Sequence, residues 1–450
     1  LGWPNENERV KTFYPTSVLI TGFDIIFFWV ARMIMMGKKF VGEVPFKEIY
    51  FHGLVRDSSG NKMSKSKGNI IDPIDLIDGI KLEDLINKRA SDLMQPEMSE
   101  KIKRNTKKEY PDGIDSYGTD SLRFTFASLA SYGRDINFNL KRVEGYRNFC
   151  NKIWNAARFV KMQSNTKLYE EDKILKDEDI WIRKKLAEII DNTNYNYKNY
   201  RFDYAAKNLY SFIWKDYCSW YIEIAKIKLN TKGTSEKEKN SLVNNLREVL
   251  KNILLLLHPI MPFITEEIYN DIYDEKKFIQ DSSYPESKNF LNDANVENID
   301  WLIEVVSAIR KTRSEIGVLP SKEIEIIVTG ENKKDKLFFK ELSSYIKGLA
   351  KISKINFSGE NVEKNYYTCV SNNLKILIPS SDLIDLDIEI SRLSKEKAKY
   401  INQALGIESR LSNSDFIKNA PGHIVVADEQ KLKDLKIKID KIDEQLKNYS

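Results

Sequence analysis

Hydrophobic and polar residues follow three different patterns along the chain, and each pattern predicts a different architecture. Near the N-terminus, short apolar β-rich runs at 17–21 and 48–52 flank a longer apolar stretch at 24–36. That stretch is apolar nearly all round, so we predict a helix that is buried on both sides. Strand, crossover helix and strand form a βαβ unit with parallel strands and a right-handed connection. A polar Gly-, Ser- and Lys-rich loop follows, and Asp72-Pro73 restarts the helical pattern.

The middle of the chain has a helical period. From residue 76 to 142, Gly and Asp interruptions predict short helices, whereas amphipathic stripes from 143 to 272 predict a helix bundle. Residues 301–379 return to a mixed pattern. We predict a helix at 301–316 there, and strands at 323–328 and 374–378.

The C-terminal tail has a heptad pattern. Apolar residues recur at alternating spacings of three and four over 383–411 and again over 432–449, with a break at 419–422 (Asn-Ala-Pro-Gly). The pattern favours an antiparallel coiled-coil hairpin over a helix pair docked on a core, because its apolar seam is narrow. The chain is therefore predicted to be mainly α-helical and divided into segments 1–90, 91–145, 146–300, 301–380 and 381–450.

Composition excludes some classes of protein. The 450 residues are 42% hydrophobic and 30% charged, as in ordinary globular domains, and no apolar run approaches the roughly 20 residues that span a bilayer. The net charge of +5 is too small to indicate a class of partner. Basic residues nevertheless cluster at 101–108 and 141–147, where they would suit contact with a nucleic-acid phosphate backbone. Three distant cysteines without CxxC spacing indicate reduced, buried thiols and no metal site.

The most specific signal is the loop 60–69, whose centre reads Lys62-Met63-Ser64-Lys65-Ser66. Two lysines three residues apart, set among hydroxyl residues and flanked by glycines, form a mobile cationic loop. A triphosphate needs such ammonium charges, hydroxyl and backbone donors, and glycines that permit close approach. We therefore predict that this loop binds a triphosphate.

This KMSKS string resembles the second signature of class I aminoacyl-tRNA synthetases, in which the matching loop closes over ATP. The resemblance implies that Lys65 contacts the phosphates as a catalytic cation and that Lys62 assists it, with Ser64 and Ser66 as further ATP ligands. The segment 21–29 (Thr-Gly-Phe-Asp-Ile-Ile-Phe-Phe-Trp) looks like the valyl-tRNA synthetase version of the segment that opens the ATP site. Segments that resemble the same family follow in order at 117–124, 133–138, 148–155, 200–203 and 257–263. The resemblance implies a Rossmann-like α/β catalytic part, a connecting stem-contact region, an anticodon-binding bundle, a small α/β segment and a tRNA-binding coiled coil.

The resemblance also assigns roles to single residues near the strand ends. Gly22 would let the backbone approach the nucleotide, and Asp24 would bind ribose hydroxyls, although a helix N-cap is an alternative for Asp24. His52 and Gly53 match the pair near the adenine. Trp29 would wall a valine pocket, with core packing as its alternative role.

The implied reaction is ATP-dependent activation of valine, accompanied by Mg²⁺, and transfer of valine to tRNA(Val) in the cytoplasm by a monomer. The sequence departs from the family because none of its three histidines sits in an HxGH-like first signature, and the editing insert is missing. We expect both upstream of Leu1, so that this chain alone does not aminoacylate. An isoleucyl- or leucyl-type synthetase and a non-catalytic tRNA-binding protein remain alternatives.

Overall fold

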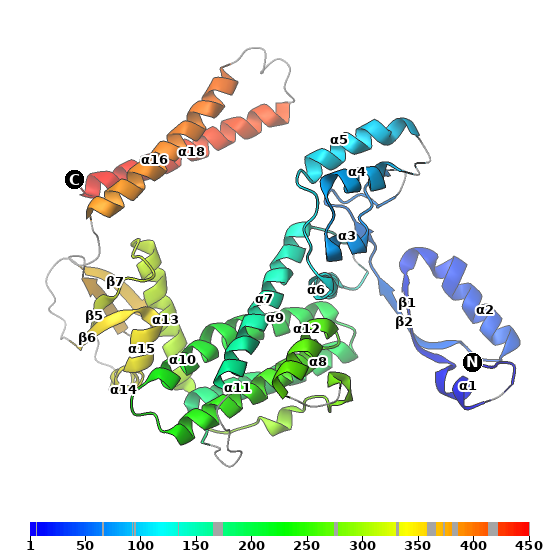
Figure 1. Cartoon of the computed structure of the whole chain (residues 1–450), viewed down its shortest axis with the longest axis horizontal. Helices are drawn as coiled ribbons and strands as arrows, with labels where there is room; N and C mark the ends of the chain where they lie inside the picture. Colours follow the sequence, from blue (N-terminus) through cyan, green and yellow to red (C-terminus); the bar gives the residue numbers. More distant parts are fainter. Residues whose placement is uncertain are drawn as a thin grey trace. The chain divides into compact units, whose positions relative to one another are not determined.

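A computed structural model gives the fold, and Figure 1 shows its elements in order. The structure describes residues 1–449 except 6, 65–66, 92, 94–95, 134, 165–173, 274–277, 330–332, 358–365, 372–373, 380–385 and 413–421. The chain forms two compact units, Leu1–Asp300 and Trp301–Ser450. In the part of the chain that is described, no helix has the length and apolar character needed to cross a membrane.

The N-terminal segment contains the predicted βαβ unit. Strands β1 (Thr16–Gly22) and β2 (Phe46–His52) are parallel, with Gly22 opposite His52. Helix α1 (Glu8–Phe13) precedes them, and η1 (Phe23–Ile25), η2 (Ile26–Val30) and α2 (Ala31–Phe40) form the helical crossover. The boundaries of both strands are confirmed to within two residues.

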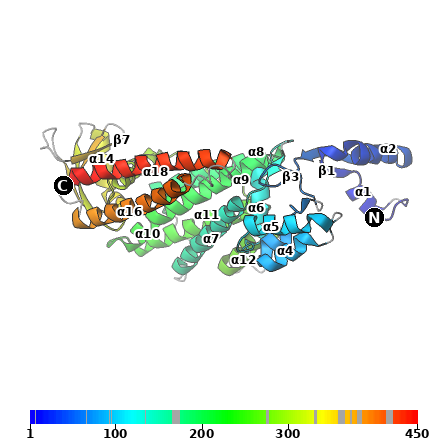
Figure 2. The ribbon, with the colours of Figure 1, turned by 90° about the horizontal axis from the view of Figure 1, so that it is seen from above.

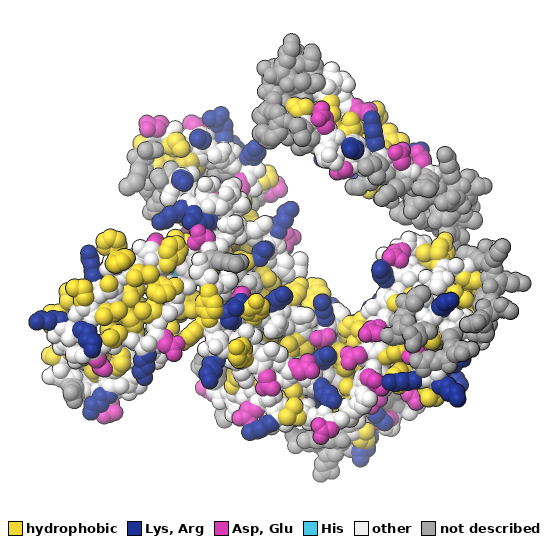
Figure 3. All heavy atoms as spheres, turned by 180° about the vertical axis from the view of Figure 1, so that it is seen from behind, with side chains coloured by type: hydrophobic (Ala, Val, Ile, Leu, Met, Phe, Trp, Pro, Cys, Tyr) yellow, Lys and Arg dark blue, Asp and Glu magenta, His cyan; other side chains and the backbone are white. Residues whose placement is uncertain are grey.

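The expected burial of the crossover helix is wrong. Its exposed apolar side chains include Phe27 at 81%, Phe28 at 69% and Met35 at 68% exposure, and Figure 3 shows hydrophobic side chains gathered over this segment. The physical reason is that β1 and β2 form a two-stranded sheet, which covers one side of the helix only. An all-round apolar sequence shows that a helix is suited to burial, and the covering surface must come from elsewhere.

The segment after β2 is built from short elements around one small core. They are β3 (Val55–Arg56), α3 (Pro73–Asp78), α4 (Leu82–Ala90), η4 (Pro96–Met98), α5 (Ser99–Glu109), α6 (Thr119–Leu129) and β4 (Ile136–Asn137). The start of α3 is confirmed, since Asp72 caps it by accepting a hydrogen bond from the Ile74 N–H at 2.9 Å, with Pro73 in its first turn. Leu76, Leu85 and Tyr110 lie in the core of this segment.

The predicted helix bundle is confirmed between residues 140 and 273. It comprises α7 (Leu140–Gln163), α8 (Asp177–Lys198), α9 (Phe202–Ser211), η5 (Phe212–Tyr221), α10 (Ile222–Asn230), α11 (Glu236–Leu257) and α12 (Pro262–Tyr273), followed by η6 (Ile279–Asp281) and η7 (Ser287–Asn289). Its core contains fully buried Leu186, Ile190 and Leu254.

Two of the sequence segments that resemble the synthetase family join the bundle to α6. Buried Asp120 accepts a hydrogen bond at 2.6 Å from the Ile264 N–H at the start of α12. Arg123 donates to the carbonyl oxygens of Ile260 at 2.9 Å and Pro259 at 3.2 Å. The carboxylate therefore satisfies N-terminal amides of α12, where negative charge is favoured.

The second unit begins with α13 (Glu297–Glu315), which matches the predicted helix at 301–316. Strands β5 (Ile324–Thr329) and β8 (Leu374–Pro379) confirm the two predicted strands, while β6 (Ile352–Phe357), β7 (Tyr366–Ser371), α14 (Lys333–Glu341) and α15 (Ser343–Ala350) were not predicted. The sheet has the order β6-β5-β8-β7, with β5 and β6 parallel and the other pairs antiparallel.

The C-terminal residues form two long helices, α16 (Leu386–Leu411) and α18 (Gly422–Tyr449), which run side by side in Figures 1 and 2. Ala404, Ile407 and Leu435 are buried between them. The ion pairs Lys436–Glu408 at 2.8 Å and Arg410–Asp428 at 3.4 Å show that the helices are antiparallel. Of the predicted turn at residues 419–422, residues 419–421 lie outside the described residues, and Gly422 is the first residue of α18.

Candidate functional site

The carboxyl ends of β1 and β2 bring three of the predicted residues together. Gly22 ends β1 opposite His52 at the end of β2, and Asp24 follows in η1. A Cβ atom at residue 22 would lie 2.6 Å from Asp24 Oδ1 and 3.7 Å from His52 Cε1. A side chain at position 22 would therefore displace Asp24 and crowd His52, so glycine keeps the strand end open to a ligand.

The orientation of these residues narrows their possible roles. Asp24 is exposed and lies inside η1, whose cap is Gly22 without a side-chain hydrogen bond, so the N-cap alternative for Asp24 is wrong. His52 is half-buried, with Nδ1 2.9 Å from the carbonyl oxygen of the buried Gly53. Trp29 is 52% exposed in η2, which disfavours a core-packing role within this chain.

The lysine loop is a hairpin that follows β3 and folds back against it. Lys62 is exposed and forms an antiparallel bridge with Arg56, while Gly60 turns the chain with φ = +81°. Met63 is half-buried against the core around Leu76 and Leu85. Lys65 and Ser66 lie outside the described residues, so the structure places Lys62, Met63 and Ser64 of the motif.

Asn69 closes this hairpin with its side-chain amide. Its Oδ1 accepts the Ser64 N–H at 2.9 Å, and its Nδ2 donates to Asp57 Oδ2 at 2.8 Å and to the Lys62 carbonyl at 3.3 Å. Asp57 Oδ1 accepts the backbone N–H groups of Asn61 at 2.7 Å and Ser59 at 3.0 Å. Burial would raise the pKa of Asp57, but the hydrogen bonds from Asn69, Asn61 and Ser59 hold it below its ordinary value.

The base of the hairpin is held by a residue far away in sequence. Asp135 accepts hydrogen bonds from the Arg56 guanidinium and, at 3.1 Å, from the Leu54 N–H. The side-chain bond from Arg56, with the bond from Leu54, lowers the pKa of Asp135. Next to Asp135, β4 pairs in parallel with β3. Neither Asn69 nor Asp135 was predicted as a site residue. Both lie in segments that the sequence analysis singled out, 60–69 and 133–138, but the spacing of residues does not show which groups their side chains bind.

A polar hollow of about 620 Å³ lies between the hairpin and α5. Its basic side chains are Lys67, Arg89, Lys101 and Lys108, and Asp57 and Glu109 supply the acidic ones. Arg89 is paired with Glu109 at 3.5 Å, and Asp57 is engaged by the hairpin itself. Two residues of the predicted basic cluster on α5, Lys101 and Lys108, therefore line the same hollow as Lys67 of the loop, where they add positive potential.

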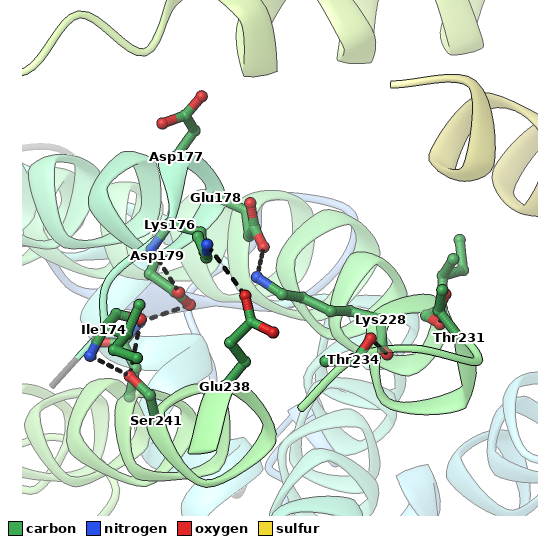
Figure 4. A network of polar contacts seen from close by, with 12 residues as sticks. Ile174, Lys176, Asp177, Glu178, Asp179, Lys228, Thr231, Thr234, Glu238 and Ser241 are labelled. Carbon is green, nitrogen blue, oxygen red and sulfur yellow. Dashed lines mark hydrogen bonds and ion pairs between the residues drawn. The ribbon is translucent and has the colours of Figure 1, made fainter. Parts of the chain in front are cut away.

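The bundle contains a polar network that holds the start of α8 (Figure 4). Glu178 forms an ion pair with Lys228 of α10, and Lys176 pairs with Glu238 of α11 at 3.0 Å. Ser241 exchanges hydrogen bonds with the backbone of Ile174, at 2.9 and 2.8 Å. These contacts join α8, α10 and α11. A separate search of the described residues finds no group of three His, Cys, Asp or Glu side chains that could hold a metal ion.

Three family models match the chain in sequence order. Residues 1–139 match "tRNA synthetases class I (I, L, M and V)", and residues 179–328 match "Anticodon-binding domain of tRNA ligase". Residues 385–449 match "Valyl tRNA synthetase tRNA binding arm". The lysine hairpin falls within the first match and the terminal helix pair within the third, while the second covers the bundle from α8 onward and leaves α7 outside.

The chain is also similar to curated relatives over nearly all its length. It is 46% identical to a valine–tRNA ligase of Francisella tularensis, with 96% of this chain and 47% of the relative covered. It is 47% identical to the enzyme of Coxiella burnetii, with 94% and 47% covered. A solved Mycobacterium tuberculosis methionyl-tRNA synthetase with methionyl-adenylate is 16% identical, covers 60% of this chain and 47% of that one, and has a TM-score of 0.44. The chain spans about half the length of the curated relatives it matches.

Proposed function

The chain belongs to the valyl-tRNA synthetase family, and on that premise we propose that it serves as the C-terminal half of a valine–tRNA ligase. Such an enzyme activates valine with ATP and transfers it to tRNA(Val). The observation that carries the proposal is the identity of 46–47% with valine–tRNA ligases, which extends from the lysine hairpin to the terminal helices. The chain has no HxGH-like run, so the proposal assigns catalysis to a polypeptide that also has the other half of the relatives' length.

The proposed chemistry needs no protein nucleophile. The valine carboxylate attacks the α-phosphorus of ATP, and valyl-adenylate and pyrophosphate are formed. Catalysis then consists of alignment and neutralisation of charge on the phosphates, for which Lys62 and Lys65 are the proposed groups, with Ser64 and Ser66 beside them. Mg²⁺ would arrive with ATP and share the phosphate charge.

The strand-end group is proposed to bind the adenosine half of ATP. Gly22 leaves room for the nucleotide, Asp24 offers carboxylate oxygens to the ribose hydroxyls, and the strand-end pair at 52–53 flanks the adenine. Parallel strands place ligands at their carboxyl ends, and the structure has Gly22, Asp24 and His52 within a few ångströms of one another there. Trp29 is proposed to wall the valine pocket, and its half-exposed indole is compatible with that contact.

We propose five segments: 1–90 for the catalytic part, 91–145 for the connecting region, 146–300 for the anticodon-binding bundle, 301–380 for a small α/β domain and 381–450 for a coiled-coil arm. The segments after residue 90 are proposed to hold tRNA(Val). The match of residues 385–449 to a tRNA binding arm supports the last assignment. We propose that the enzyme acts as a monomer in the cytoplasm, where its tRNA substrate is found.

Valine-dependent exchange of labelled pyrophosphate into ATP tests the proposal. The protein for this assay has both this chain and the half of the relatives' length that it does not span. We expect exchange with valine, slow exchange with isosteric threonine and almost none with isoleucine. Preferential exchange with isoleucine or leucine would identify a different synthetase, and tRNA binding without any exchange would identify a non-catalytic binding protein.

The lysine role is tested by Lys65→Ala in the same assay. We expect the barrier to activation to rise by about 2–4 kcal/mol, with a smaller change in the KM for valine, because the cation acts on charge that develops in the transition state. Lys67→Ala is the matched control, since it removes the same charge from the same loop outside the motif. Near-normal turnover of Lys65→Ala would contradict the role.

A further inference from the structure

The Asn69 side chain contacts both limbs of the lysine hairpin. It accepts from the Ser64 N–H at 2.9 Å on the motif itself and donates to the Lys62 carbonyl at 3.3 Å. On its other side it donates to Asp57 Oδ2 at 2.8 Å. Residues 65 and 66 lie in sequence between Ser64 and Asn69, so this amide ties together the backbone on both sides of the second lysine.

Asp57 completes the arrangement because its two oxygens have different partners. Its Oδ1 accepts the Asn61 and Ser59 N–H groups and so holds the turn around Gly60, while its Oδ2 accepts from Asn69. An amide opposite a carboxylate has one donor that matches one acceptor. Two carboxylates at these positions would repel each other. Two amides would leave one donor without an acceptor, because Asp57 uses both of its oxygens.

Apolar packing reaches the described part of the hairpin at few positions. Between residues 60 and 69, Gly68 is the buried position among the described residues, and Met63 is the half-buried apolar side chain. A cationic loop that must face a triphosphate has to keep its ammonium groups in solvent, so its shape depends on directional hydrogen bonds instead of burial. The Asn69–Asp57 pair supplies such bonds to Ser64, Asn61 and Ser59, in addition to the bond between the two side chains.

We propose that Asn69 and Asp57 together are positioning residues for amino-acid activation: they hold the lysine hairpin in the shape that presents Lys62 to the ATP phosphates. This inference rests on the proposed function. It assigns no contact between Asn69 and the substrate. It follows that the activation rate should depend on the hydrogen bond between the two side chains more than on which of the two is the amide and which the carboxylate.

An exchange of the two residues tests this consequence. Asn69→Asp places two carboxylates face to face. Asp57→Asn leaves the arrangement one acceptor short, because a single amide oxygen cannot accept both from Asn69 and from the Asn61 and Ser59 N–H groups, so each single variant disrupts the arrangement. The double variant Asn69→Asp/Asp57→Asn restores it with reversed polarity: the amide at 57 donates to the carboxylate at 69, which still accepts the Ser64 N–H. This double variant lacks the hydrogen bond to the Lys62 carbonyl, because a carboxylate at 69 has no proton to donate.

Pyrophosphate exchange in the complete polypeptide is the first measurement. Each single variant should lower the activation rate by about 10- to 100-fold, since small misplacements of catalytic groups have effects of that size. The double variant should recover to within about threefold of the wild type, and the absent hydrogen bond to Lys62 accounts for the remainder. Asn105→Asp is the matched control, because it adds the same charge to the same hollow on α5 and should leave the rate unchanged.

Hydrogen exchange of the Ser64 amide in this chain is the second measurement, and it needs no catalysis. Exchange should quicken in both single variants and slow again in the double variant, while the midpoint of thermal unfolding stays the same. Single variants that activate valine at the wild-type rate, or a double variant that recovers neither rate nor protection, overturn the inference. A wild type without valine-dependent exchange overturns the proposed function instead, and the amide protection then still decides whether the pair holds the hairpin.

Discussion

The helix bundle and the lysine hairpin belong to the same compact unit but are held together by different forces. In the bundle, side chains such as Leu186, Ile190 and Leu254 are fully buried, and even the polar Tyr221 and Asp179 are enclosed. In the hairpin, two of the motif's described side chains are half-buried, and Lys62 is exposed. The bundle is therefore stabilised by area removed from water, and the hairpin by a few directional bonds.

This difference follows from what each region is proposed to do. A scaffold that carries a large tRNA has to resist deformation, and close packing provides that resistance. A loop that closes over ATP has to open again, so it must belong to the less stable part of the molecule. Stability and activity should consequently respond to different substitutions in the two regions.

The largest expected change in stability comes from Leu254→Ala in the bundle. Its side chain is fully buried, so the truncation leaves a cavity and should lower the free energy of unfolding by about 2–5 kcal/mol. Urea denaturation followed by tryptophan fluorescence measures this change. Leu291→Ala, at a side chain that is 70% exposed, is the control and should be nearly silent. If Leu254→Ala also quickened native-state exchange of the Ser64 amide, the two regions would not be independent.

A smaller loss is expected from Tyr221→Phe. The Tyr221 hydroxyl donates to Asp179 Oδ1 and accepts from Asn245 Nδ2, both at 2.6 Å, and all three groups are buried. Removing the hydroxyl leaves the carboxylate and amide short of a partner, which should cost about 1–3 kcal/mol of unfolding free energy. Tyr195→Phe, at a 68% exposed ring, is the matched control. A stabilised Tyr221→Phe protein would show that packing alone holds this part of the bundle.

The same carboxylate predicts a pH dependence that is confined to the bundle. Burial first, and then repulsion from Glu178, raises the pKa of Asp179 from 3.8 to about 6. The folded state thus binds a proton more tightly than the unfolded state. Its contribution to stability is fully present below pH 3.8 and is lost as the pH rises through 6.

Asp179→Asn isolates this contribution. Between about pH 4 and 6, the free energy of unfolding of the wild type should fall as the pH rises, by no more than about 1.4 kcal/mol per pH unit from this group. The variant should not show this fall, because an asparagine does not titrate. Chemical denaturation at a series of pH values measures both slopes. Parallel curves for the two proteins would mean that Asp179 titrates as an ordinary carboxyl group.

The sequence predicted the elements of both regions but not the contacts that hold the hairpin. Periodicity gave β1, β2, the bundle and the terminal helices, because apolar spacing and burial are directly linked there. It failed for the crossover helix, where the apolar residues 27–29 are more than half exposed, because a pattern does not reveal whether a covering surface lies within the same chain.

For the candidate site, the sequence predicts a chemistry but not a geometry. Lys62 and Ser64 were predicted because a rare string of cations and hydroxyls has few other uses. Asp135 was not, because its partners Arg56 and Leu54 lie about 80 residues away and no local pattern marks a hydrogen bond across that separation. Asn69 was within the predicted loop, yet an asparagine after a glycine is equally typical of any turn.

The smallest expected change in global stability, and the sharpest contrast with the bundle, comes from Met63→Ala. Met63 is the apolar anchor of the hairpin and packs, half-buried, against the core that contains Leu76. Truncation should change the free energy of unfolding by less than about 1 kcal/mol, because the site is partly solvent-exposed. It should nonetheless quicken exchange of the Ser64 amide and slow pyrophosphate exchange, since the motif loses its hold on the core. Met63→Leu keeps the volume and should restore both. A global loss as large as that of Leu254→Ala would mean that the hairpin is part of the folding core, and the division between scaffold and loop would then be wrong.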